Sequence, residues 1–264
     1  MRILLIADTH FLNDYQGELE QVKLNYSPKE KLIAFLDSVD FSRVDAVIHL
    51  GDIVHSAGVS VYKDFDDLLR SYLDKDKSIY YCVGNHDNKE AFYDFKGLSD
   101  YTKPYDYTID LETYKLIFMD TSLKGKWTGG LSKAQEEWLL EQLEVASKNK
   151  QAALLFQHHP FNIGWKNEDP QMLMSKNLAS TLEHSSLKAI FTGHLHMQRF
   201  SLVAGIPQYS LGSLAYGIDD INGNLYHTNK LQAGVLELEK DLLDLNPLNI
   251  ENNLEILSKY PYYG

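Results

Sequence analysis

The sequence predicts an α/β fold in which buried parallel strands alternate with helices. Three nearly continuous apolar runs, at 2–7, 45–50 and 78–83, are separated by stretches with helical character, and two more lie at 152–157 and 188–193. Unbroken apolar runs are typical of strands covered on both faces, as in a parallel sheet. Strands that alternate with helices favour such a sheet, so the class is α/β.

Two helices are expected between the first three strands. Ser27 and Glu30 form a capping-box pattern around Pro28, which occupies the first helical position, so a helix is predicted from there to about residue 37. Apolar periodicity over 60–74 predicts the second helix.

The second half of the chain adds a helix and antiparallel strands. Ser132 and Gln135 form another capping box, which opens a helix with one apolar face. A hairpin is expected near 104–109 and 114–120, and short strands with Gly and Asn-Gly turns are expected over 198–239. These antiparallel additions predict more than one sheet.

Composition limits the classes of function. The 264 residues carry a net charge of −12, which makes nucleic acid an unlikely partner, since duplex-binding proteins present a basic face. Cys82 is the one cysteine, so no internal disulfide is expected. The apolar run before Asp8 is too short for a signal peptide, and no stretch is long enough to span a membrane. A cytoplasmic protein without a membrane partner is expected, and assembly into a homo-oligomer is compatible with the sequence.

Polar residues cluster directly after the buried strands. In open α/β sheets, this carboxyl end of the strands is the edge where ligands bind. Each cluster alone could be an ordinary turn, and adjacent histidines could be packed core residues. The alternation in 193–196 places two imidazoles on one side of an extended segment. Five clusters at five strand ends together predict a metal site: Asp8 and His10; Asp52; Asn85, His86 and Asp87; His158 and His159; His194 and His196.

The order of these clusters resembles the calcineurin-like metallophosphoesterases. Asp-x-His, Gly-Asp, Gly-Asn-His-Asp, His and Gly-x-His-x-His follow one another between residues 1 and about 215. The segments GDIVHSAGVSVYKDF, IYYCVGNHDN, TGGLSKAQEEWLLEQL and QHHPFNIG are similar to class III cyclic nucleotide phosphodiesterases and related glycerophosphodiesterases. The resemblance implies a four-layer α/β/β/α sandwich with two mixed sheets, formed by a domain over 1–240, and a C-terminal extension of unknown role over 241–264.

The resemblance also implies a dinuclear metal centre. One ion would be held by Asp8, His10, Asp52 and His196, and the other by Asp52, Asn85, His158 and His194, with the Asp52 carboxylate bridging. Imidazole, carboxylate and amide ligands without a thiolate suit manganese, iron or zinc ions. Such a pair of ions clamps both oxygens of an in-line displacement and supplies a bridging hydroxide as the nucleophile.

The four residues of the Gly84-Asn85-His86-Asp87 segment are expected to have different roles. Gly84 lets the chain turn, and Asn85 binds both metal and substrate. His86 contacts the substrate and donates a proton to the leaving group. Asp87 caps the following helix and braces the loop.

Two further histidines complete these expectations. His159 is a weaker candidate for substrate contact. His55 stands where many related phosphatases have an aspartate that orients the acidic histidine, which raises the question of what holds His86.

The expected function is hydrolysis of a small phosphodiester, with a 3′,5′-cyclic nucleotide as the first substrate to test. A glycerophosphodiesterase is the nearest alternative, followed by a phosphomonoesterase or a nucleotide pyrophosphatase. A nuclease is disfavoured by the acidic charge. A non-catalytic scaffold is disfavoured because all seven ligand positions are filled.

Overall fold

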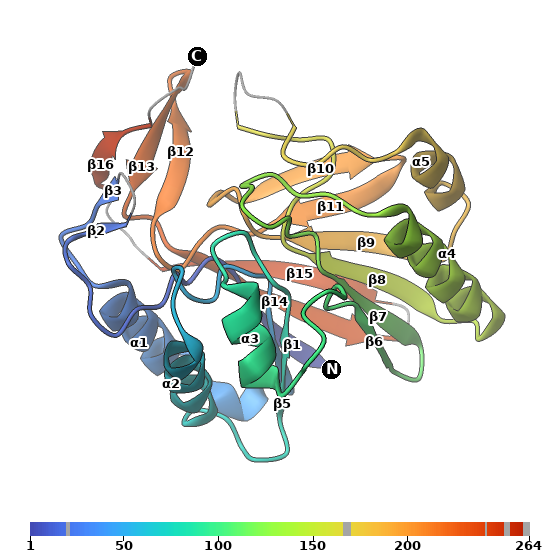
Figure 1. Ribbon diagram of the computed structural model, residues 1–264, viewed down its shortest axis with the longest axis horizontal. Helices are drawn as coiled ribbons and strands as arrows, with labels where there is room; N and C mark the ends of the chain where they lie inside the picture. The colour runs from blue at the N-terminus through green and yellow to red at the C-terminus, as the bar shows by residue number, and fades with distance from the viewer. Residues whose placement is uncertain (20–21, 166–169, 241, 251–253, 261–264) are drawn as a thin grey trace.

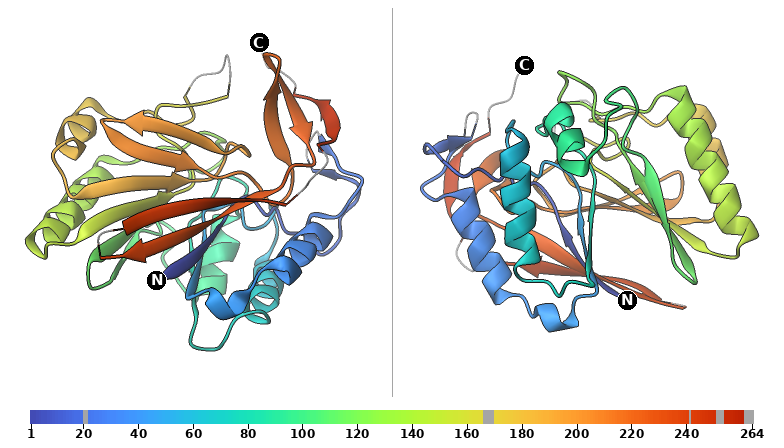
Figure 2. Two further views of the ribbon diagram at one scale, coloured as in Figure 1. Left: turned by 180° about the vertical axis from the view of Figure 1, so that it is seen from behind. Right: turned by 60° about the horizontal axis from the view of Figure 1, so that its bottom comes forward.

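Two β-sheets face each other, and helices cover their outer surfaces (Figure 1; Figure 2, right). The computed structural model describes residues 1–264 apart from 20–21, 166–169, 241, 251–253 and 261–264. The order of layers is helix, sheet, sheet, helix, which confirms the predicted α/β sandwich.

The first sheet has the strand order β15-β14-β1-β4-β5. Its parallel part consists of β1 (Arg2–Ile6), β4 (Ala46–His49) and β5 (Ser78–Tyr81). β14 (Gln232–Glu239) runs antiparallel to β1, and β15 (Leu242–Asn249) pairs with β14 along its whole length. The chain beyond residue 240 therefore contributes an edge strand to this sheet.

The second sheet has the order β10-β11-β9-β8-β7-β6. Its four inner strands are parallel, and an antiparallel strand lies at each edge. The strands are β6 (Tyr107–Asp110), β7 (Tyr114–Met119), β8 (Ala152–Gln157), β9 (Leu187–Thr192), β10 (Arg199–Val203) and β11 (Ile206–Ser210).

The unbroken apolar runs are explained by burial on both faces of each sheet. In β1, Ile3 and Leu5 point into the core between the two sheets, whereas Leu4 and Ile6 point toward the helices. Successive strand side chains alternate between faces, so a strand with two buried faces needs apolar residues at every position.

Among the described residues, five α-helices complete the layers. The first sheet is covered by α1 (Pro28–Ser38), α2 (Val59–Arg70) and α3 (Lys89–Lys96), and the second by α4 (Lys133–Lys148) and α5 (Lys176–Leu182). A short 3₁₀ helix, η1 (Phe41–Arg43), follows α1.

Only one of the two predicted capping boxes forms. The Ser132 side chain accepts from the Gln135 amide, and the Gln135 side chain accepts from the Ser132 amide. The Ser27 side chain makes no cap bond, so that prediction was wrong. Pro28 fixes φ at the first helical position, and the helix begins through the backbone bond from the Lys31 amide to the Ser27 carbonyl.

A smaller sheet stands above the strand ends of the sandwich (Figure 1). It contains β12 (Gly217–Ile221), β13 (Asn224–Thr228) and β16 (Ile256–Lys259), with the β2 (Glu18–Leu19) and β3 (Val22–Lys23) hairpin beside it. Within the described residues, the helices are too short or too polar to cross a membrane.

Candidate metal centre

The strand ends of the two sheets bring the seven predicted metal ligands into one cluster. Ligand atoms of Asp8, His10 and His196 lie within 4.8 Å of one another, and so do those of Asp8, Asp52 and His158. The remaining two ligands adjoin this cluster. Asn85 Oδ1 lies 3.2 Å from His158 Nε2, and the His194 ring centroid lies 5.1 Å from that of His158.

The backbone at this cluster adopts an unusual conformation. Five of the seven residues have positive φ angles between 42° and 71°, a region that non-glycine residues rarely occupy. Such strain persists only where the surrounding structure fixes it, and it concentrates at functional sites. Strain shared by these residues supports the fit of this cluster to bound cations: Asp8, His10, Asp52, His194 and His196.

Two glycines allow the strand ends to approach each other. A Cβ atom on Gly84 would lie 2.1 Å from Asp52 Oδ1, and one on Gly193 would lie 2.7 Å from Asp8 Oδ2. Gly84 does not adopt a positive φ angle. The chain bends directly after Gly84, and glycine is needed there because the Asp52 carboxylate occupies the space of a side chain.

Backbone carbonyls orient two of the imidazoles. His158 Nδ1 lies 2.8 Å from the Leu50 carbonyl, and His196 Nδ1 lies 2.9 Å from the Tyr216 carbonyl. A carbonyl only accepts, so each Nδ1 must carry a proton, and Nε2 is the nitrogen that faces the cluster. Metal-binding histidines are held in the same way by acceptors on their second nitrogen.

The charges of the cluster are strongly coupled. Burial raises the pKa of Asp8, and the Asp52 carboxylate acts in the same direction. Burial also opposes ionisation of Asp52, but neighbouring imidazoles, led by His158, outweigh it and lower the pKa of this carboxyl. Burial alone would lower the pKa of His158, yet the two carboxylates raise it to about 9. Without a metal, the protein thus compensates the buried negative charge with a proton, a role that a cation can fill.

Asp87 braces the loops that carry the ligands. Its carboxylate accepts from the amides of Ile53 and Val54 at 3.1 and 3.2 Å, from the Gly84 amide at 2.9 Å and from the Tyr62 hydroxyl at 3.0 Å. This bracing was expected, but the predicted helix-capping role was wrong.

Asn88 is the residue that caps α3. Its side chain accepts from the Ala91 amide at 3.1 Å. The Asp87 carboxylate accepts instead from two amides of the neighbouring loop and from the Gly84 amide of its own loop.

His159 contacts the protein through both ring nitrogens. Nδ1 lies 2.8 Å from the Thr121 hydroxyl, and Nε2 lies 3.1 Å from the Trp127 carbonyl. Burial lowers the pKa of His159, with His158 adding to the effect, so the ring is neutral. The geometry gives this ring a packing role and supplies no support for substrate contact.

Several residues of the site carry no motif in the sequence. Gln171 Oε1 lies 3.2 Å from His194 Nε2, and the Ser213 hydroxyl donates to the Asp8 carbonyl at 2.8 Å. His49 braces the turn after β4, because its Nδ1 accepts from the Gly51 amide. The position of His49 inside the apolar run 45–50 was the one available signal, whereas Gln171 and Ser213 are recognisable only from the folded chain.

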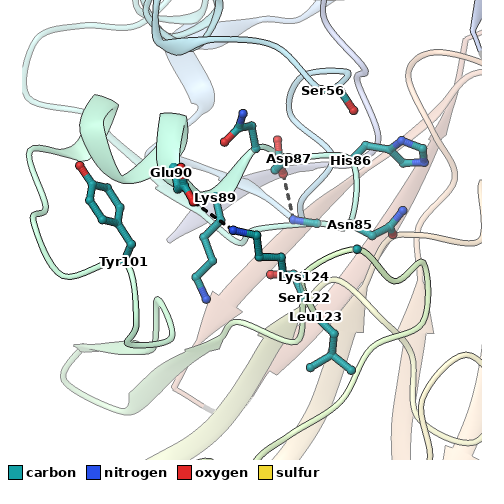
Figure 3. A pocket seen from close by; sticks show the side chains of 13 residues that line it. Ser56, Asn85, His86, Asp87, Lys89, Glu90, Tyr101, Ser122, Leu123 and Lys124 are labelled. Atoms are coloured by element: carbon teal, nitrogen blue, oxygen red, sulfur yellow. Dashed lines mark hydrogen bonds and ion pairs between the residues drawn. The ribbon is translucent and has the colours of Figure 1, made fainter.

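A cavity of about 430 Å³ opens beside the cluster. Asn85 and His86 lie at one end and Tyr101 at the other, with Lys89 and Lys124 between them (Figure 3). Both lysines are paired: Lys89 Nζ lies 2.7 Å from Asp120, and Lys124 Nζ lies 3.1 Å from Glu90. The cavity gives room for a group attached to a phosphate at the metal cluster.

Comparison with known proteins identifies the family. Residues 1–198 match the model of the calcineurin-like phosphoesterases. The chain is 29% identical over 221 residues to a "Probable cyclic nucleotide phosphodiesterase" of Rhodococcus erythropolis, covering 81% of this chain and 71% of that one. It is also 29% identical over 204 residues to a "Probable glycerophosphodiester phosphodiesterase" of Arcobacter nitrofigilis, covering 74% of this chain and 72% of that one.

Solved structures share the fold. A dimetal phosphatase from Danio rerio superposes with a TM-score of 0.69 at 17% identity, covering 96% of this chain and 99% of that one.

The chain belongs to the calcineurin-like phosphoesterase family, and it is a metal-dependent phosphoesterase. The predicted family and enzyme class are confirmed.

Proposed function

We propose that this protein is a phosphodiesterase with two metal ions bridged by Asp52. One observation carries the proposal: Asp52 Oδ2 lies 3.8 Å from His10 Nε2 and 3.3 Å from His158 Nε2. These imidazoles belong to different halves of the cluster, so a single carboxylate oxygen faces both halves. Asp8, His10 and His196 form one half, and Asn85, His158 and His194 form the other.

The ligand types suit the proposed ions. Nitrogen and oxygen donors without a thiolate favour manganese, iron or zinc. When bound, such ions would polarise the phosphoryl group and supply a nucleophilic hydroxide near neutral pH. Asp8 and Asp52 are 0% and 1% exposed, so both carboxylates are held within the packed interior.

His86 is proposed to donate the proton to the leaving alkoxide. Its backbone amide donates to Asp52 Oδ1 at 2.8 Å, which fixes the residue beside the cluster. Its imidazole is outside the proposed ligand set and lies with Asn85 at one end of the cavity (Figure 3). A positioned general acid contributes about 10²–10⁴-fold to such a reaction.

The proposed substrate is a small phosphodiester, first of all a 3′,5′-cyclic nucleotide. The names of both relatives support a phosphodiester, and the cavity of about 430 Å³ has room for its ester group. Lys89 and Lys124 line this cavity. Each ammonium group is paired with a carboxylate, so this lining does not disfavour a choline headgroup. Glycerophosphocholine is the second candidate because the other relative is named for a glycerophosphodiester.

A substrate panel tests the proposal. The metal-loaded protein is assayed against cyclic AMP, glycerophosphocholine and a bis(aryl) phosphate reporter, with Asp52→Asn as the inactive control. We expect turnover of cyclic AMP and of the reporter. Turnover of neither diester, with activity on phosphomonoesters or nucleotide pyrophosphates, would overturn the phosphodiesterase assignment. Failure to bind metal would overturn the catalytic assignment altogether and favour a scaffold.

A further inference from the structure

His55 lies between a proposed metal ligand and the proposed proton donor. Its Nδ1 is 3.1 Å from His10 Nδ1, and its ring is stacked on that of His86 with centroids 4.8 Å apart and planes at 20°. We propose that His55 is a positioning residue with two separable roles: it fixes the tautomer of His10 for metal binding, and it orients the His86 ring for proton donation. This inference rests on the function proposed above.

The first role follows from the geometry of His10. His10 Nε2 faces the cluster, 3.1 Å from His196 Nε2 and 3.8 Å from Asp52 Oδ2. An imidazole nitrogen binds a metal through its lone pair, so the proton of neutral His10 must be on Nδ1. His55 Nδ1 faces that proton and must therefore accept it. An acceptor on the second nitrogen orients a metal-bound imidazole and strengthens it as a ligand.

The second role follows from the way the two loops are joined. The Ser56 amide donates to the His86 carbonyl at 2.9 Å, and the His86 amide donates to Asp52 Oδ1 at 2.8 Å. The Asp87 carboxylate, next to His86, accepts at 3.1 Å from the amide of Ile53, which lies in the loop that carries His55. The backbones on either side of His55 and His86 are thus fixed to each other, and the flat face of one ring limits the rotation of the other.

The two roles use different parts of the side chain. Asparagine places Oδ1 on Cγ, where histidine carries Nδ1, so it can accept from His10 but has no ring. Phenylalanine keeps a ring to stack on His86 but has no acceptor. His55→Asn and His55→Phe therefore separate the roles, and His184→Phe is the matched control, since His184 is an exposed histidine in the turn before β9.

The first measurement is the affinity of the metal-free protein for Mn²⁺ by calorimetry. Loss of an acceptor that orients a ligand costs about 10–100-fold in metal affinity. We expect a loss of this size in His55→Phe and near-normal affinity in His55→Asn and His184→Phe. Equal affinity in both His55 variants would overturn the first role.

The second measurement compares leaving groups at saturating metal. The reporter leaves as an aryl oxide and needs no proton, whereas cyclic AMP leaves as an alkoxide. We expect His55→Asn to lower kcat for cyclic AMP by up to about 10²-fold, as for a misplaced catalytic group, and to change kcat for the reporter little. Equal losses on both substrates would overturn the second role.

A measurement on the wild type keeps the inference testable if a variant does not fold. Nitrogen-15 NMR of the imidazoles in the zinc-loaded protein reports which nitrogen of His10 carries the proton. We expect it on Nδ1, and a proton on Nε2 would overturn the inference. If the wild type binds no metal, the proposed function itself fails. If the wild type is active but the His55 variants keep its metal affinity and kcat, only the inference about His55 fails.

Discussion

The two edges of the first sheet differ in how they place charge. At its amino edge, Lys77 Nζ lies 3.6 Å from Asp45 Oδ1, and the Asp45 side chain is 50% exposed. At its carboxyl edge, the Asp8 and Asp52 side chains are buried among imidazoles on strained backbone. Exposed pairs contribute little to stability, whereas buried charges are costly unless compensated. Of these two edges of the first sheet, the one where the chemistry is proposed carries the strained backbone and the buried charge.

Replacing Asp52 tests the buried charge at the carboxyl edge and is expected to have the largest effect. Asp52→Asn removes the proposed bridging charge while keeping an oxygen for the His86 amide. We expect metal affinity and turnover to fall by more than about 10²-fold, which exceeds the loss typical of a residue that only hydrogen-bonds to a metal ligand. The melting temperature of the metal-free protein should also fall, because the variant removes the carboxylate that compensates the buried proton on His158. Metal titration and thermal unfolding measure both effects, and retained activity in the variant would be incompatible with a bridging role.

Replacing His86 separates catalysis from metal binding at the same edge. His86→Ala should lower kcat for cyclic AMP by about 10²–10⁴-fold because the leaving group loses its proton donor. Metal content, measured by elemental analysis, should be unchanged. A variant that has lost its metal would instead identify His86 as a ligand.

Replacing Asp87 tests the hydrogen bonds that hold the two ligand-bearing loops together. Asp87→Ala leaves the Gly84 amide, two loop amides and the Tyr62 hydroxyl without their acceptor. Each buried group left unsatisfied costs about 1–3 kcal/mol, so we expect the free energy of unfolding to fall by about 3 kcal/mol or more. Urea unfolding measures it. Tyr62→Phe, which removes only one donor, should cost far less, and equal losses would argue against the shared carboxylate.

Replacing Lys77 tests the opposite edge. Lys77→Ala breaks the pair with Asp45, and we expect a change in unfolding free energy within about 1 kcal/mol, with unaltered turnover. A loss comparable with that of Asp87→Ala would show that the two edges are not as different as their exposure indicates.

The layers and the strand ends could be predicted from the sequence because they depend on local patterns. Continuous apolar runs indicate strands buried on both faces, and β8 begins and ends at the predicted residues 152–157. The polar clusters follow such runs directly, so the parallel arrangement brings the clusters of each sheet to its carboxyl edge. The two groups meet because the two sheets face each other.

Contacts between loops could not be predicted in the same way. Whether Asp87 caps its own helix or serves the loop of Ile53 depends on how two strand ends meet. Likewise, His159 reads like His158 in the sequence, but only the folded chain shows that both of its nitrogens are engaged. The carboxylate that crowds Gly84 is 32 positions away in the chain, a separation that no local pattern reports.

The central claim is that Asp52 bridges two metal ions. Anomalous diffraction from crystals of the Mn²⁺-loaded protein tests it most directly. We predict two peaks on either side of the Asp52 carboxylate, about 3.5–4 Å apart as in other two-metal sites. A single peak, or two peaks of which only one contacts Asp52, would contradict the claim.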